Sequence, residues 1–75
     1  MLKSVFLEEL QELLQRDDPI DPDMALRDMG EWDSLAVMSC MAYFDRKFNV
    51  KTKISQYERL RTVSDLVALS DGAVT

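Results

Sequence analysis

The sequence predicts an all-α domain of four helices, with a short third helix and a long loop between the first two. Apolar residues recur at helical spacing in the first, second and last of these segments, and both prolines fall between the first and the second. No stretch alternates polar and apolar residues as a half-buried strand does. A chain of this length buries only about 60% of its unfolded surface. We therefore expect residues 1–75 to form a single domain with one core.

The composition is that of a folded globular domain, and it excludes several kinds of chemistry. Apolar residues make up 47% of the chain and charged residues 31%. With one cysteine and no histidine, the chain lacks the residues for an internal disulfide, a zinc site or a Ser-His-Asp triad. No apolar run reaches the roughly 20 residues of a membrane span, and glutamates follow where a signal peptide would be hydrophobic. We expect a cytoplasmic protein without a membrane span.

The net charge of −5 argues against nucleic acid as a partner, because phosphates require a basic surface. The charge is unevenly distributed along the chain. Residues 1–33 hold ten acids and three bases, a net charge of −7, whereas residues 34–75 hold four acids and six bases, a net charge of +2. The acidic first half predicts basic proteins as partners.

The first predicted helix covers residues 2–16. Its apolar residues project onto one side at 3.6 residues per turn. They are Leu2, Phe6, Leu7, Leu10, Leu13 and Leu14. Pro19 and Pro22 then stop the helix, because proline lacks a backbone N–H and restricts the residue before it. The loop that follows runs to about Trp32, and we expect Ile20, Leu26 and Met29 to anchor it to the core.

The second predicted helix covers residues 34–47. Asp33 is placed to cap its first turn, and Trp32 before it is expected to pack against Val37 as a hydrophobic staple. The predicted core face consists of Val37, Cys40, Met41, Phe44 and Phe48. Cys40 on this face is interpreted as a small buried hydrophobe and not as a nucleophile.

A second, weaker apolar strip lies on the other side of this helix. It is formed by Leu35, Met38 and Ala42. Such a strip either contacts the long loop or is an exposed patch that binds partners. The sequence favours neither alternative.

Two short helices complete the prediction. Ser55 and Glu58 have capping-box spacing and predict a helix of roughly 56–60. Thr62 and Asp65 repeat that spacing before a last helix, which we expect to end before Asp71. Its apolar residues are Val63, Leu66, Val67 and Leu69. The tail 73–75 is expected to fray.

At the start of the second helix, Asp33-Ser34-Leu35 resembles the modification site of the acyl and peptidyl carrier protein family. Two further segments resemble that family, one at the end of its helix two and one at the entry to its helix four. They are Phe48-Asn49-Val50 and Leu60-Arg61-Thr62-Val63-Ser64-Asp65-Leu66. The resemblance covers nearly all of the chain and implies a four-helix bundle of the acyl-carrier type.

The resemblance implies that Ser34 carries 4′-phosphopantetheine and that the thiol of this arm holds cargo as a thioester. The unpaired amides of a helix start suit a phosphodiester there, although serine is also common at helix starts for capping alone. Asp33, besides capping, is implied to lie at the interface with the transferase. Leu35 is implied to contact partners, together with Met38 and Ala42. We expect a monomer that is not itself an enzyme.

The partners that the resemblance implies are a phosphopantetheinyl transferase, a ligase that loads an acyl or aminoacyl group, and downstream synthase or transferase enzymes. Fatty-acid carriers place several acids along helix two, and this chain departs from that pattern. Along the second helix this chain has the neutral Ala36 and Ser39, one acid, Asp45, and the basic residues Arg46 and Lys47. Since charges at an interface rim tune partner choice, we expect a freestanding carrier of a specialised pathway and not of bulk fatty acid synthesis.

Two alternatives stay open at this point. Trp32-Asp33-Ser34-Leu35 is also similar to discrete aminoacyl or peptidyl carriers, which an adenylating enzyme loads. The second alternative belongs to a different functional class: the chain keeps the same fold but is an unmodified helical module that binds other proteins. Four methionines surround the junction, and we interpret them as filling gaps in the core and not as a shelter for cargo. They are Met24, Met29, Met38 and Met41.

Overall fold

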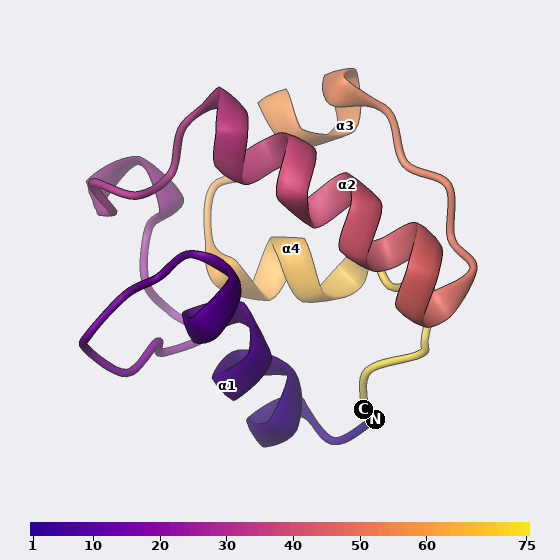
Figure 1. Cartoon of the computed structure of the whole chain (residues 1–75), viewed down its shortest axis with the longest axis horizontal. Helices are drawn as coiled ribbons and strands as arrows, with labels where there is room; N and C mark the ends of the chain where they lie inside the picture. Colours follow the sequence, from indigo (N-terminus) through magenta and orange to yellow (C-terminus); the bar gives the residue numbers. More distant parts are fainter.

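Four α-helices and one 3-10 turn form the fold in the computed structural model, which describes all residues 1–75 and confirms the predicted all-α class with a short third helix. In chain order the elements are α1 Lys3–Leu13, η1 Leu26–Asp28, α2 Ser34–Phe48, α3 Ile54–Glu58 and α4 Val63–Ala68. The longest helix, α2, crosses the molecule in Figure 1, with α3 above it, α4 below it and α1 at the lower left. The two chain ends lie next to each other. None of the helices is long and apolar enough to span a membrane.

The core is a single cluster of fifteen buried apolar residues drawn from every helix and from the long loop. At its centre Phe6 from α1 and Phe44 from α2 are fully buried, with ring centroids 6.0 Å apart. Tyr43 and Phe48 complete the aromatic cluster on α2, with ring centroids 5.6 Å apart. Aromatic contacts of this kind fix α1 against α2.

The first helix is shorter than predicted. It ends at Leu13, because Gln15 adopts a left-handed conformation with φ 55°. The N–H of Arg16 then reaches back to the carbonyl of Gln11 at 3.0 Å, which is the pairing of a Schellman-type helix end. Leu2 was predicted on the core side and is instead 65% exposed, because it precedes the helix and does not follow its periodicity.

The long loop is anchored as predicted. Ile20, Leu26 and Met29 are all buried in the core. Backbone hydrogen bonds also join the loop to the entry of α4, from Leu26 N to Arg61 O at 2.9 Å and from Val63 N to Met24 O at 3.0 Å. Buried side chains and backbone hydrogen bonds therefore hold the loop at several points before it enters α2.

The core face of α2 is turned slightly from the predicted one. Cys40 and Phe44 are buried as expected, and Ala36 and Tyr43 are buried with them. The other predicted core residues are only partly buried against the cluster, namely Val37, Met41 and Phe48. Asn49 ends the helix in a left-handed conformation, and the N–H of Val50 bonds to the carbonyl of Phe44 at 3.2 Å.

The predicted capping box of the third helix is wrong, whereas that of the fourth is confirmed. α3 begins at Ile54, and Gln56 Oε1 accepts from Lys53 N at 2.7 Å, so Ser55 lies inside the helix and not at its cap. In α4, Thr62 Oγ1 accepts from Asp65 N at 3.3 Å, and Asp65 Oδ2 accepts from Thr62 N at 3.1 Å.

The tail does not fray as predicted, because it contributes to the core and pairs with the start of the chain. Val74 is buried, and its N–H donates to Ser70 Oγ at 3.2 Å. Thr75 pairs by its backbone with the first residues, from Lys3 N to Thr75 O at 2.9 Å and from Thr75 N to Met1 O at 2.8 Å. The two chain ends therefore stabilise one another (Figure 1).

Candidate functional site

The candidate site lies where the long loop meets α2. Asp33 occupies the cap position in an extended conformation, and its Oδ1 accepts a hydrogen bond from Ala36 N at 2.9 Å, which confirms the predicted cap. Ser34 is the first residue of the helix and is exposed. The first turn leaves the N–H groups of Ser34 and Leu35 without a protein acceptor. An exposed hydroxyl thus stands beside two free amides at the positive end of a 15-residue helix.

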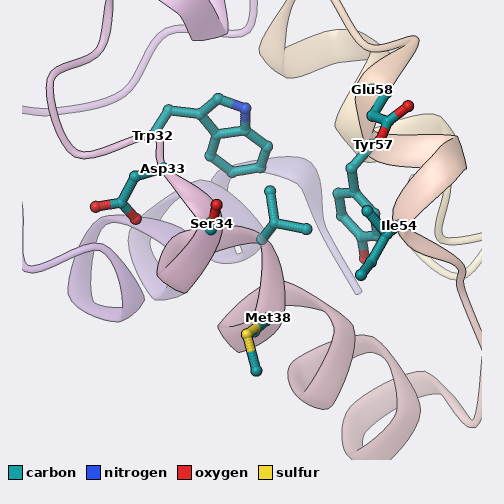
Figure 2. Close-up of a pocket in the computed structure, with 8 residues that line it drawn as sticks. Trp32, Asp33, Ser34, Met38, Ile54, Tyr57 and Glu58 are labelled. Atoms are coloured by element: carbon teal, nitrogen blue, oxygen red, sulfur yellow. The ribbon is translucent and has the colours of Figure 1, made fainter.

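An apolar groove of about 320 Å³ adjoins Ser34 and separates the start of α2 from α3. Its lining residues are Trp32, Asp33, Ser34, Val37, Met38, Ile54, Tyr57 and Glu58. Figure 2 shows the indole of Trp32 directed toward α3, whereas the carboxylate of Asp33 points away from it. The groove therefore adjoins Ser34 and has an apolar wall on each side, from α2 and from α3.

Trp32 and Tyr57 both line this groove, with ring centroids 6.5 Å apart. Tyr57 is buried, and its hydroxyl forms a hydrogen bond of 2.8 Å with Thr52 Oγ1. Burial raises the pKa of the Tyr57 hydroxyl, so it stays protonated at neutral pH. Trp32, which was predicted as a staple on Val37, lies in the same groove as Val37 and also packs on α3.

The apolar strip of Leu35, Met38 and Ala42 is exposed. Leu35 is 72% exposed and Met38 is 60% exposed, so the alternative that the loop covers this strip is wrong. Met38 belongs both to this strip and to the rim of the groove (Figure 2). Ala36 is buried, so an acid at this position would not have faced solvent.

On the other side of Ser34 lies a second hollow of about 310 Å³, between the end of α1 and the start of α2. Leu13 at the end of α1 and Leu14 directly after it line one side, and Leu35 and Ser39 line the other side from α2. Beside it, Arg16 Nη1 forms an ion pair of 2.8 Å with Glu31 Oε1. The pKa of Glu31 lies below its ordinary value, first because its own backbone N–H donates to it and further because of Arg16. The ionised pair joins the end of α1 to the entry of α2.

No group of acids and cysteine in the structure could hold a metal ion. Cys40 is buried beneath α2, and burial raises the pKa of its thiol to about 12. The thiol is therefore neutral and shielded, which agrees with its interpretation as a core residue. Of the polar side chains at this helix start, the Ser34 hydroxyl is the exposed nucleophile.

Comparison with known families decides what this arrangement is. The family model described as a phosphopantetheine attachment site matches residues 4–70, which is most of the chain. The chain belongs to this family. Its members are carrier proteins, and their cofactor is 4′-phosphopantetheine, which confirms the predicted family and cofactor. Carriers of this family interact with the transferase that modifies them and with synthase enzymes.

A solved structure supports the same fold for this carrier. The holo acyl carrier protein of Geobacter metallireducens matches with a TM-score of 0.70 and 20% sequence identity, over 89% of this chain and 78% of that one. At this identity the likeness establishes the fold. Among curated proteins none matches the chain.

The start of α2 fits the cofactor of the carrier family. The phosphate of the arm would lie next to the free amides of Ser34 and Leu35, where the helix dipole favours negative charge. The groove beside Ser34 offers the rest of the arm an apolar surface from Trp32 to Ile54. No acid of α2 lies in its first turn to oppose the phosphate.

The sequence predicted one side of this site and missed the other. Asp33, Ser34 and Leu35 were identified from their place at a helix start. The wall formed by Ile54, Tyr57 and Glu58 was missed, because it depends on how α3 folds back beside α2. Arg16 was missed as well, since its partner Glu31 lies 15 residues away and no local pattern links the two.

Proposed function

We propose that this protein carries acyl intermediates as thioesters on a 4′-phosphopantetheine arm attached to Ser34. The observation that carries the proposal is the exposed hydroxyl on the first residue of α2, in a chain of the phosphopantetheine attachment family. The free amides beside it and the adjoining apolar groove support the same residue as the attachment point. Partner enzymes perform the chemistry, and this chain presents the cargo.

Attachment is a phosphoryl transfer to the Ser34 hydroxyl from coenzyme A. A bond forms between Ser34 Oγ and the phosphorus next to the pantetheine, and the bond from that phosphorus to the bridging oxygen breaks. 3′-Phosphoadenosine 5′-phosphate leaves, and the serine proton passes to a base on the transferase. In this structure Asp33 Oδ1 caps the helix and no hydrogen bond joins the carboxylate to Ser34, so we assign the base to the transferase. The chain contributes the exposed hydroxyl of Ser34 as the nucleophile.

After attachment, the chain's own residues hold and present the arm. The amides of Ser34 and Leu35 stabilise the phosphodiester by hydrogen bonding and by the helix dipole. Trp32 and Ile54 offer the arm apolar contacts in the groove. When bound, the arm supplies a thiol that forms the thioester with the cargo.

The outward face of α2 supports partner enzymes other than those of bulk fatty acid synthesis. This helix has one acid, Asp45, followed by Arg46 and Lys47. Its exposed strip is apolar, formed by Leu35, Met38 and Ala42. A partner with a matching apolar patch would bind it, whereas a strongly basic patch would find little complementary charge on this helix.

Modification in vitro tests the proposal. The purified chain is incubated with coenzyme A and a broad-specificity phosphopantetheinyl transferase, and intact mass is measured. We expect a gain of one phosphopantetheine, lost in Ser34→Ala and kept in Ser39→Ala, which removes a neighbouring serine of the same helix. No mass gain with several transferases would contradict the attachment.

The cargo distinguishes this function from its alternatives. If protein purified from its native cells holds an acyl group as a thioester, the proposal is supported. If the thioester holds an amino acid, the chain is an aminoacyl carrier, a class that the Trp32-Asp33-Ser34 junction also resembles. An unmodified interaction module would bind its partners equally well as Ser34→Ala, through the exposed strip that begins at Leu35.

A further inference from the structure

The ion pair between Arg16 and Glu31 is the most shielded of the three in the chain. The two side chains are 16% and 33% exposed, and Nη1 and Oε1 are 2.8 Å apart. The pair of Lys51 with Asp45 is 79% and 50% exposed, and Lys47 approaches Glu9 only to 3.8 Å. Shielding reduces the screening of the Arg16–Glu31 pair by water and salt.

The two partners come from two segments that meet beside the start of α2. Arg16 follows the left-handed Gln15, and its N–H bonds to the carbonyl of Gln11 in α1. Glu31 lies three residues before Ser34 and directly before Trp32. The pair thus joins the end of a helix to the last residues of a long loop, just before the serine.

Stability alone explains this pair poorly. The Nε of Arg16 is buried and has no hydrogen-bond partner, which costs free energy. A shielded ion pair is weak evidence for net stability, and in some proteins buried polar or ionic groups serve to select one conformation among several. The conformation that this pair selects is the path from Glu31 through Asp33 into α2.

We propose that Arg16 is a positioning residue for the modification of Ser34, acting through its ion pair with Glu31. The inference rests on the proposed attachment to Ser34. The pair holds the end of the loop in the conformation that a phosphopantetheinyl transferase binds. Most free chains therefore already have the conformation needed for binding. If only a fraction of the chains had this conformation, the apparent affinity would fall to that fraction of its full value, while the rate of the bound complex would not change.

Two substitutions separate positioning from a simple charge effect. Arg16→Gln leaves a free carboxylate at the junction, and Glu31→Gln leaves a free guanidinium, so their effects on local charge are opposite. If the transferase merely responded to charge, KM would rise in one variant and fall in the other. Positioning predicts that KM rises in both, because each variant breaks the same contact.

The experiment measures transfer from saturating coenzyme A at varied concentrations of the carrier. We expect KM for the carrier to rise roughly threefold to tenfold in Arg16→Gln and in Glu31→Gln, the range for loss of one partly shielded ion pair, with kcat within about twofold of wild type. Arg16→Lys, which can keep the ion pair, should recover most of the loss. Lys51→Gln is the matched control, because it removes an ion pair away from the site and should leave KM unchanged.

Amide hydrogen exchange gives an independent measure in the same proteins. Exchange of the hydrogen-bonded Trp32 and Ala36 amides should be faster in Arg16→Gln than in wild type and unchanged in Lys51→Gln. Unchanged KM in both junction variants, or shifts in opposite directions, would overturn the positioning role while leaving the attachment to Ser34 intact. A wild-type chain that no transferase modifies would overturn both proposals.

Discussion

Asp33 Oδ1 lies 2.9 Å from Ala36 N and closes the first turn of α2 around Ser34. This single contact uses one of the amides of the helix start and leaves those of Ser34 and Leu35 free. It also directs the Asp33 carboxylate away from the groove that adjoins the serine (Figure 2). Capping and the presentation of the serine are therefore consequences of the same geometry.

Removing this cap should destabilise the protein. We expect Asp33→Ala to lower the free energy of unfolding by about 1 kcal/mol, measured by urea denaturation, because an orphan amide loses its acceptor. Asp33→Ser keeps a capping oxygen and should unfold close to wild type. The serine variant lacks the carboxylate implied at the transferase interface, so its KM for the transferase should rise although its stability does not fall. Equal stability of Asp33→Ala and wild type would contradict the capping role.

The exposed strip should matter for partners and not for folding. We expect Leu35→Ala to change the free energy of unfolding by less than about 0.5 kcal/mol, because the side chain is mostly in solvent. The same variant should slow transfer by the transferase and by downstream enzymes. Leu2→Ala is the control, since Leu2 is similarly exposed and precedes α1, outside both the strip and the groove. A Leu35→Ala chain that serves its enzymes normally would remove this residue from the interface.

Asp65 should make the fold sensitive to acid. The backbone N–H groups of Arg61 and Thr62 donate to its carboxylate at 3.0 and 3.1 Å and hold its pKa below the ordinary value. Because the folded-state pKa is lowered, ionised Asp65 stabilises the fold above the unfolded pKa of about 3.9, and this contribution is lost as pH falls through the folded-state pKa. The urea midpoint should fall between about pH 5 and pH 3, and fall less in Asp65→Asn. Parallel pH profiles for the two proteins would contradict this role.

The buried thiol makes a direct count of attached arms possible. Cys40 is the one cysteine of the chain, and burial raises its pKa to about 12, so little reactive thiolate is present at pH 8. The folded chain before modification should therefore react slowly with a disulfide reagent such as Ellman's reagent. After modification one thiol should react at once, and a second only on denaturation. Rapid reaction of the unmodified folded chain would show that Cys40 is accessible.

The sequence allowed the prediction of features that depend on local chemistry. The Asp33 cap and the Thr62 capping box follow from short spacings, and the anchoring of the loop by Leu26 follows from an apolar residue in a polar segment. Ser34 was identified because its neighbours and its place at a helix start match a family pattern. Each of these inferences needs only a few consecutive residues.

Features that depend on how distant segments meet were not predictable in this way. The tail is ordered by a tertiary contact, because Val74 is buried in the core, and α1 ends at a left-handed Gln15 although no glycine marks that position. Tyr57 reaches the groove only because α3 packs beside α2. The Arg16–Glu31 pair requires both the end of α1 and the path of the loop, neither of which a local pattern specifies.

The most direct test of the central claim is the intact mass of the protein purified from its own cells, with fragmentation to locate any added group. The proposed function predicts that the protein carries a phosphopantetheine, alone or with cargo, in addition to its unmodified mass, and that fragmentation places this group on Ser34. A chain that keeps its unmodified mass in these cells, or that carries the group on another residue, would contradict it.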